Sequence, residues 1–331
     1  MTAFHHRSFR LGQLTHLCVF DMRPPPVRIM IPSFIELATD APMMTERPAI
    51  PDLPLRHFRL EWLPQGDFPS HYYLGSAWRG ALGYALKANH PDLFEQLYVK
   101  GEESGQQPPL VLSPLTQGNE EEGYQFTLDV ILAGSISERP VEVLESLIQA
   151  GLSGLYGTPF SAITLQAFLP QTGWFPTALD VCAQVPCFGI ESAPPAPATV
   201  AIHLLHPLRI KGPRGILHPQ DFKTEELLTR ILRRYHNLRY DYRGVGLPDW
   251  AGSKAAALSL TTRDQALNWH DWSRYSHRQE QSIPMGGLLG HIVLEGQGLE
   301  AVWPHLWAGQ WLHVGKGAMM GLGQYALEAL D

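Results

Sequence analysis

The sequence has little of three things: cysteine, charge and long apolar runs. Its three cysteines, Cys18, Cys182 and Cys187, form neither a disulfide framework nor a zinc-binding pattern. A reducing, cytoplasmic setting fits them best. No run of about 18 apolar residues occurs, and the N-terminus lacks the apolar segment and small-residue cleavage site of a secretory signal. We therefore expect neither a membrane-spanning helix nor secretion.

Metal-binding spacings are also missing. The histidines show no HxxxH pair and the cysteines no CxxC pair, so we expect no bound metal and no cofactor. Charged residues make up 17% of the 331 residues and hydrophobic residues 44%, which is enough for packed cores in two domains of ordinary size. The net charge of −7 argues against a wholly basic nucleic-acid-binding protein.

One stretch departs from this acidic balance. Residues 206–243 contain nine Lys or Arg against four Asp or Glu, a local net charge of +5, and three tyrosines lie among them. Basic residues mixed with aromatic ones suit a phosphate backbone with stackable bases. The alternative is the solvated face of a helix. The basic residues are Arg209, Lys211, Arg214, Lys223, Arg230, Arg233, Arg234, Arg239 and Arg243.

The hydrophobic pattern repeats one order of elements twice. Alternation predicts strands and 3.6-residue periodicity predicts helices. The first unit is a strand at 56–64, a helix at 72–90 with Ser70 as N-cap, strands at 109–115 and 124–134, a helix at 140–152 and a strand at 161–170. A Pro- and Ala-rich linker follows at 191–198. The second unit is a strand at 199–208, a helix at 221–238, strands at 267–276 and 286–296, a helical stretch at 298–310 and a strand at 323–330.

This order predicts an α+β protein with two tandem ferredoxin-like (RRM-like) β-α-β-β-α-β domains. We expect an irregular, Pro-rich N-terminal extension at 1–50, an N-terminal domain at 51–190 and a C-terminal domain at 199–331. The last connection of the second domain carries the most distinctive pattern of the chain.

That pattern is a glycine run near the C-terminus. Gly315, Gly317, Gly321 and Gly323 fall within nine residues, with Lys316 among them. Glycine lets backbone N–H groups approach a bulky anion, and a Lys adds a point charge for phosphate. The spacing fits neither a Walker loop nor a dinucleotide fingerprint, which disfavours a small-molecule nucleotide binder. The alternative is a tight turn before the final strand.

Five segments of the chain together resemble one family. They are YLGSAWRGALGYAL (73–86), PPLVLSP (108–114), HPLRIKG (206–212), WSRYSHRQ (272–279) with the downstream GGLLG, and the glycine-rich LHVGKGAMMGLGQY (312–325). On these segments the chain is similar to the CRISPR precursor-crRNA processing endoribonucleases of the RAMP superfamily, from about residue 56 to its end. That resemblance implies tandem ferredoxin-like domains, binding of RNA hairpins and metal-independent cleavage, and it says nothing about residues 1–50.

Metal-independent RNA cleavage makes the ribose 2′-OH attack its own 3′ phosphate, which needs a base, an acid and donors for the developing charge. In the family that the chain resembles, the acting His commonly sits in or near the first helix of the first domain. His71 occupies that place, with Tyr72 beside it and Arg79 two turns further on. The alternative for His71 is a surface residue before a helix. Lys316 is the fourth catalytic candidate, through phosphate contact.

Further residues are candidates for RNA binding. Alternation along a strand at 272–279 places Arg274 and Arg278 on one face, where they could hold phosphates or form a salt-bridged surface. His313 alternates in phase with a strand leading into the glycine run, as a packed His or as a site residue. The complete set of RNA-binding candidates is Arg209, Lys211, Arg233, Arg234, Arg274, Arg278, His313, Gly315, Gly317, Gly321 and Gly323.

Two functions follow from the resemblance. The first is an endoribonuclease that cleaves CRISPR repeat RNA at the base of a stem-loop, leaves a 2′,3′-cyclic phosphate and a 5′-OH, and stays with the crRNA in an interference complex. The second is a non-enzymatic RNA-binding subunit of such a complex. The expected partners are repeat RNA or crRNA and other CRISPR effector subunits, with no membrane.

Overall fold

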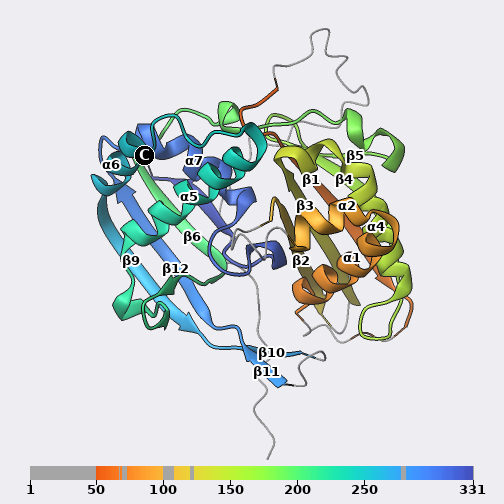
Figure 1. Cartoon of the computed structure of the whole chain (residues 1–331). Coiled ribbons are helices and arrows are strands. Elements are labelled where there is room, and N and C mark those ends of the chain that lie inside the picture. The colour runs from red at the N-terminus through yellow and green to blue at the C-terminus, as the bar shows by residue number, and fades with distance from the viewer. Residues whose placement is uncertain are drawn as a thin grey trace, which may run out of the picture.

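Two antiparallel sheets, each covered on one face by helices, make up the described part of the chain (Figure 1). The computed structural model describes residues 50–66, 68, 73–99, 108–119, 123–276 and 281–330. All but the last residue of the expected extension at 1–50 therefore lies outside the described residues.

The N-terminal sheet has the strand order β2-β3-β1-β4-β5. Its first four strands reproduce the 4-1-3-2 arrangement of a ferredoxin-like domain, and β5 extends it at one edge. Helices α1 and α4 pack against each other over the sheet. The elements are β1 (Leu55–Pro64), α1 (Gly75–Asn89), α2 (Pro91–Phe94), β2 (Leu110–Asn119), β3 (Gly123–Ala133), α4 (Pro140–Ser153), β4 (Phe160–Leu169) and β5 (Gly173–Pro176).

Helix α1 shows why these residues form a helix that covers a sheet. Trp78, Leu82 and Leu86 recur every four residues and are all buried, so they form one apolar stripe. The helix begins at Gly75 with Leu74 in the N-cap position, so the prediction of Ser70 as N-cap was wrong. Ser70 itself lies outside the described residues.

The C-terminal sheet has the order β13-β6-β12-β9, which is again the ferredoxin-like arrangement. Helices α5 and α7 pack together on one face of this sheet. The tandem fold predicted from the sequence is confirmed. The elements are β6 (Thr199–Leu208), β7 (Lys211–Gly212), β8 (Gly215–Ile216), α5 (Thr224–Arg243), α6 (Trp250–Leu258), β9 (Thr261–His270), β10 (Ser273–Ser276), β11 (Gln281–Pro284), β12 (Gly287–Glu295), α7 (Leu299–Leu312) and β13 (Tyr325–Ala329).

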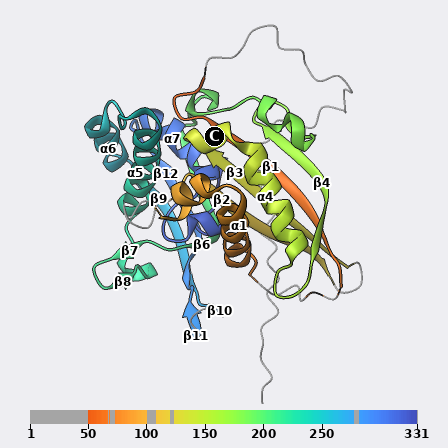
Figure 2. The same ribbon diagram turned by 45° about the vertical axis from the view of Figure 1, so that its right-hand side comes forward.

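Short elements complete the chain, and the sequence pattern missed most of them. The strand predicted at 267–276 is divided between β9 and β10, and β10 pairs with β11 to form a hairpin that projects from the domain (Figures 1 and 2). Helix α6 begins after Asp249, whose side chain accepts a hydrogen bond from the Gly252 N–H. Short 3-10 helices span Gly134–Glu138, Leu179–Gln184, Ile190–Ser192, Pro219–Asp221 and Ala318–Met320, and a π-helical turn spans Glu95–Val99.

The two domains share an extensive contact. Leu53 and Leu55 of the first domain belong to the hydrophobic core built mainly by the second. Helix α5 holds the same segment through polar contacts, because the Arg239 guanidinium lies 2.5 Å from the Asp52 carboxylate and Arg243 donates to the Pro51 carbonyl at 2.8 Å. Residues at the start of the first domain therefore fix its position against α5.

Candidate functional site

The glycine run forms a loop between the two sheets, drawn in dark blue beside β2 in Figure 1. All four glycines have positive φ: 85° at Gly315, 91° at Gly317, 92° at Gly321 and 68° at Gly323. Side chains other than glycine rarely adopt this conformation. A Cβ at position 315 would lie 2.6 Å from the Arg209 carbonyl oxygen. Conformation and close packing both require glycine here.

Several backbone N–H groups of this loop donate to carbonyls of the loop itself or of the end of β6 and the residues just after it. Lys316 N–H donates to the Arg209 carbonyl at 2.7 Å, Gly323 N–H to Pro207 at 3.2 Å, and Gly321 N–H to Ala318 at 3.0 Å. These donors are already used, so they do not form an anion nest. The arrangement favours a tight turn for the backbone and leaves the Lys316 side chain as the group that can meet a phosphate.

The loop also packs against the N-terminal domain. Met319 is 4% exposed and belongs to the hydrophobic core of that domain. A Cβ at Gly321 would lie 3.0 Å from the carbonyl oxygen of Leu112 on β2. The Gly321 carbonyl accepts a hydrogen bond from His206 Nδ1 at 2.8 Å. A loop that belongs to the second domain therefore completes the core of the first.

The entry to helix α1 meets this loop. The Tyr73 hydroxyl donates to the Met320 carbonyl, and Gly75 packs so closely on the same carbonyl that a Cβ would clash with it. Trp272, at the base of the β10–β11 hairpin, lies edge-on to the Tyr73 ring at a centroid distance of 4.8 Å. Three segments thus converge: the start of α1, the glycine loop and the hairpin base. The catalytic candidates His71 and Tyr72 precede Tyr73 and lie outside the described residues.

Trp272 and Met320 are residues that the sequence analysis did not assign to the site. Trp272 lies in the segment WSRYSHRQ (272–279), and its large amphipathic ring beside a hairpin could have indicated a site residue. Met320 acts through its backbone carbonyl, and no property of its side chain could have revealed that contact.

His313 is not on a strand, so that prediction was wrong. It is the C-cap residue of α7, with φ 53° and ψ 168°, a conformation nearly restricted to glycine. The side chain is 1% exposed. Burial, with a smaller effect of His206, lowers the pKa of His313 to about 3. Burial also lowers the pKa of His206. These rings are neutral and packed, so His313 supports the loop rather than facing solvent.

Arg79 lies on α1, half-buried, with its guanidinium 5.0 Å from the centroid of the Tyr98 ring. The Tyr98 hydroxyl donates to the Arg79 carbonyl at 2.6 Å. Burial raises the pKa of Tyr98, so the phenol stays neutral. These contacts join Arg79 to the π-helical turn after α2 and not to the glycine loop.

The basic candidates divide into exposed and buried residues. Lys211, Arg233 and Lys316 are exposed. Arg234 is 8% exposed, and it donates to the Pro108 carbonyl at 2.9 Å and to Leu312 at 3.3 Å. Burial lowers the pKa of Arg234 to about 10, which leaves it charged at neutral pH. Arg234 thus bridges the domains, and this geometry does not favour direct contact with RNA.

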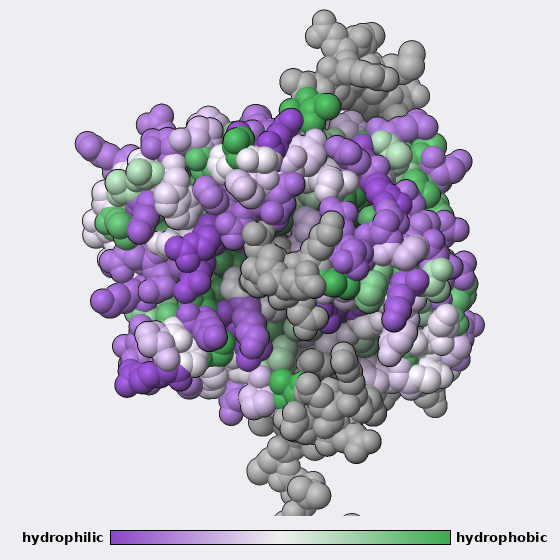
Figure 3. All heavy atoms as spheres, viewed as in Figure 1, coloured by the Kyte–Doolittle hydropathy of each residue, from purple (hydrophilic) through white to green (hydrophobic). Residues whose placement is uncertain are grey.

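Arg209 is also buried, and its guanidinium donates to the carbonyls of Pro284 and Gly286, each at 3.1 Å. Arg234, Arg239 and Arg243 also bind groups within the protein. The 206–243 stretch therefore offers a ligand fewer cations than its charge count suggested. Figure 3 shows that the surface of the C-terminal domain on this face is largely hydrophilic, with single hydrophobic residues among the hydrophilic ones.

Arg274 lies on β10, opposite Ile283 of β11, as its backbone pairing shows. Arg278 lies outside the described residues, so the predicted arginine pair is not tested. Among the described residues, no group of three or more His, Cys, Asp and Glu side chains could hold a metal ion. In the same part of the chain, no helix is long and apolar enough to cross a membrane.

Residues 202–325, which include the glycine loop and the base of the hairpin, match the model of the family described as CRISPR-associated endoribonuclease Cas6. The C-terminal domain matches the Cas6 family. Over the C-terminal domain, this match agrees with the resemblance that the sequence suggested. No curated protein matches the chain by sequence.

Solved Cas6 structures share the fold. A Cas6 product complex aligns with a TM-score of 0.60 and 16% identity over 83% of this chain and 100% of that chain. A Thermus thermophilus Cas6 aligns with a TM-score of 0.51 and 13% identity over 83% of this chain and 99% of its own. A chain of a partial Cas6-RT-Cas1–Cas2 complex aligns with a TM-score of 0.53 and 16% identity over 83% of this chain and 46% of that chain. At such identities the likeness establishes the tandem ferredoxin-like fold.

Proposed function

We propose that the protein is a metal-independent endoribonuclease that binds CRISPR repeat stem-loops and cleaves precursor crRNA. Cleavage leaves a 2′,3′-cyclic phosphate and a 5′-OH, and the protein stays with the crRNA in an interference complex. The family match to the C-terminal domain and the likeness to Cas6 product complexes support RNA processing. The likeness to a chain of a partial Cas6-RT-Cas1–Cas2 complex supports an assembly with other CRISPR proteins.

The observation that carries the proposal is the convergence of the glycine loop with the start of α1. The Tyr73 hydroxyl holds the Met320 carbonyl, which ties the loop bearing the exposed Lys316 to the segment that follows His71. Lys316, whose charge can neutralise the phosphate, therefore lies on a loop that contacts Tyr73, and Tyr73 follows His71 by two positions in the sequence.

The chemistry assigns different tasks to these residues. The 2′-OH must lose a proton and the 5′ oxygen must gain one, and a His is suited to either step because its unperturbed pKa lies near neutrality. His71 takes this role in the proposal, with Tyr72 beside it. Lys316 stabilises the charge on the phosphorane. The buried and neutral His313 is poorly placed for proton transfer.

Cleavage by the purified full-length chain in excess EDTA tests the proposal. The substrate is a transcript of a repeat hairpin, and the product ends are identified chemically. We expect full activity in EDTA, a cyclic phosphate that acid opens, and a 5′-OH that a kinase can label. Activity that is lost in EDTA and returns with Mg²⁺ or Mn²⁺ would contradict the mechanism. Hairpin binding without any cleavage would support the alternative of a non-enzymatic RNA-binding subunit.

A further inference from the structure

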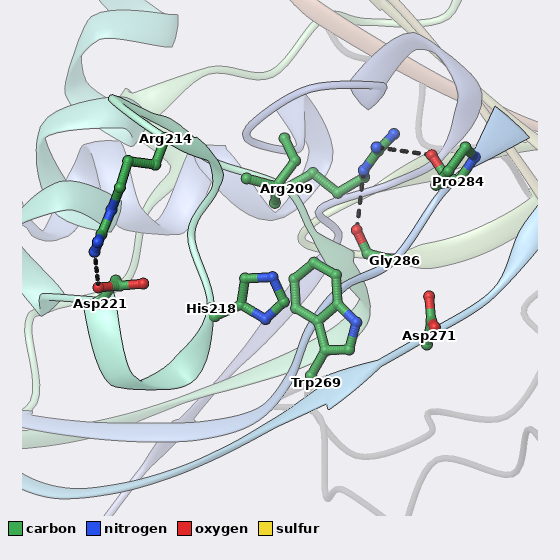
Figure 4. A pocket seen from close by; sticks show the side chains of 9 residues that line it. Arg209, Arg214, His218, Asp221, Trp269, Asp271, Pro284 and Gly286 are labelled. Carbon is green, nitrogen blue, oxygen red and sulfur yellow. Dashed lines mark hydrogen bonds and ion pairs between the residues drawn. The ribbon is translucent and has the colours of Figure 1, made fainter.

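A hollow of about 250 Å³ lies in the C-terminal domain where the connection between β6 and α5 meets the base of the β10–β11 hairpin (Figure 4). It is separate from the contact between Tyr73 and Met320. The side chains that matter for its chemistry are Arg209, Arg214, His218, Asp221, Trp269 and Asp271.

One wall of the hollow is aromatic. The His218 and Trp269 rings stack at a centroid distance of 3.9 Å and an interplanar angle of 22°. Gly286 fixes the indole, because a Cβ there would lie 2.5 Å from Trp269 Cζ2. Trp269 is half-buried and His218 is exposed. The Trp269 ring is therefore packed against the protein, whereas the His218 ring is open to solvent.

Polar groups of both signs surround that stack. Arg214 forms an ion pair with Asp221 at 2.9 Å, yet its side chain remains 85% exposed, and a guanidinium carries five N–H donors. The exposed Asp271 carboxylate lines the hollow on another side and can accept hydrogen bonds. Figure 4 shows Arg214 and Asp271 on opposite sides of the aromatic pair.

The hollow adjoins the glycine loop through one residue. The Arg209 carbonyl accepts the Lys316 N–H at 2.7 Å, while the Arg209 side chain lines the hollow. Lys316 and a lining residue of the hollow are therefore direct neighbours. The volume lies below the roughly 300–1,000 Å³ typical of sites for drug-sized ligands, so it suits one nucleobase rather than a longer segment.

We propose that this hollow binds one unpaired nucleotide of the RNA, outside the stem. Its base stacks against the His218–Trp269 pair, its phosphate meets Arg214, and an amino group of the base donates to Asp271. Stacking on aromatic rings is open to an unpaired base, whereas bases within a stem are already stacked and paired. This inference rests on the proposed function, since the same RNA is the ligand.

Binding of three hairpins tests the inference: one is blunt, one has unpaired nucleotides on the 5′ side and one has them on the 3′ side. All three carry a 2′-deoxy residue at the cleavage position, so none is cut. We expect His218→Ala and Arg214→Gln to weaken binding of a flanked hairpin about tenfold, within the range for one stacked base. Their affinity for the blunt hairpin should equal that of the wild type, and so should their cleavage rate on a separate all-ribose repeat hairpin. His218→Phe keeps an aromatic ring and should retain most of the affinity.

Arg263→Gln is the matched control, because Arg263 is a 63% exposed arginine on β9 that does not line the hollow. Wild-type affinity of His218→Ala and Arg214→Gln for both flanked hairpins would overturn the inference. An equal loss on blunt and flanked hairpins would overturn it as well. In both cases a wild-type protein that still cleaves the all-ribose hairpin leaves the proposed function intact. A wild-type protein that binds none of the three hairpins would overturn the proposed function and this inference together.

Discussion

Replacing Met319 tests whether the glycine loop joins the two domains. Met319→Ala removes three side-chain heavy atoms from a position that is 4% exposed within the N-terminal core. Truncation of a buried Met to Ala costs about 2–5 kcal/mol. We expect the lower part of that range, about 2–3 kcal/mol, because a loop can partly close the gap.

Urea unfolding measures this loss. For a denaturant dependence of about 2 kcal/mol per M, the expected loss lowers the midpoint by about 1–1.5 M. Met319→Leu keeps a similar volume and should lose less than about 1.5 kcal/mol. Met320→Ala is the matched control, because the neighbouring side chain is only half-buried and Met320 contacts Tyr73 through its backbone carbonyl.

The loop should also lose its alignment with α1, so Met319→Ala should bind and cleave hairpin RNA more weakly than Met320→Ala does. Equal midpoints and equal cleavage rates for the two alanine variants would refute the reasoning. The glycine run would then be a turn that serves the C-terminal domain alone.

Three further predictions concern single side chains. Lys316→Ala should fold normally yet lose RNA affinity or cleavage rate and flatten the salt dependence of binding by about one charge, whereas the exposed Lys87→Ala should change neither. Arg233→Gln should weaken RNA binding and flatten its salt dependence without loss of stability. Arg234→Gln should instead lower the urea midpoint, because the Pro108 and Leu312 carbonyls lose a buried donor. The opposite pattern would contradict the assignment of Arg233 to the RNA surface and of Arg234 to the domain contact. Acidification below pH 6.5 should destabilise the wild type by up to about 1.4 kcal/mol per pH unit, because the unfolded chain protonates His313 while the folded chain excludes the proton until about pH 3. Urea midpoints measured against pH should fall less steeply for His313→Asn.

The sequence pattern predicted the long elements well. Strand β6 spans the predicted 199–208, and α4 begins at the predicted Pro140. Both have a clear period and a proline or a linker at the boundary, so local signals were sufficient. The short α6 and the β7–β8 pair lack such periods, and only the packed C-terminal domain defines them.

His313 shows why the end of α7 was misread. The stretch from Trp303 to Leu312 is apolar on nearly every side, because α7 packs against both α5 and the N-terminal domain. A continuous apolar run does not distinguish a buried helix from a strand. The helix therefore extends two residues beyond the predicted end at 310.

The candidate site was predictable only in part. Glycine at four positions correctly indicated unusual backbone conformation, which the positive φ values show. Charge counting could not separate Arg233 from Arg234, since adjacent helical residues point about 100° apart and only the packing decides which is buried. The insertion of Met319 into the other domain is a tertiary contact without any local signal.

The most direct test of the account measures single-turnover cleavage and binding separately for His71→Ala. We expect this variant to bind a 2′-deoxy hairpin as tightly as the wild type and to cleave the normal hairpin at least about 100-fold more slowly, the usual effect of losing a positioned acid or base. Cleavage at the wild-type rate would contradict the assignment and remove His71 from the mechanism.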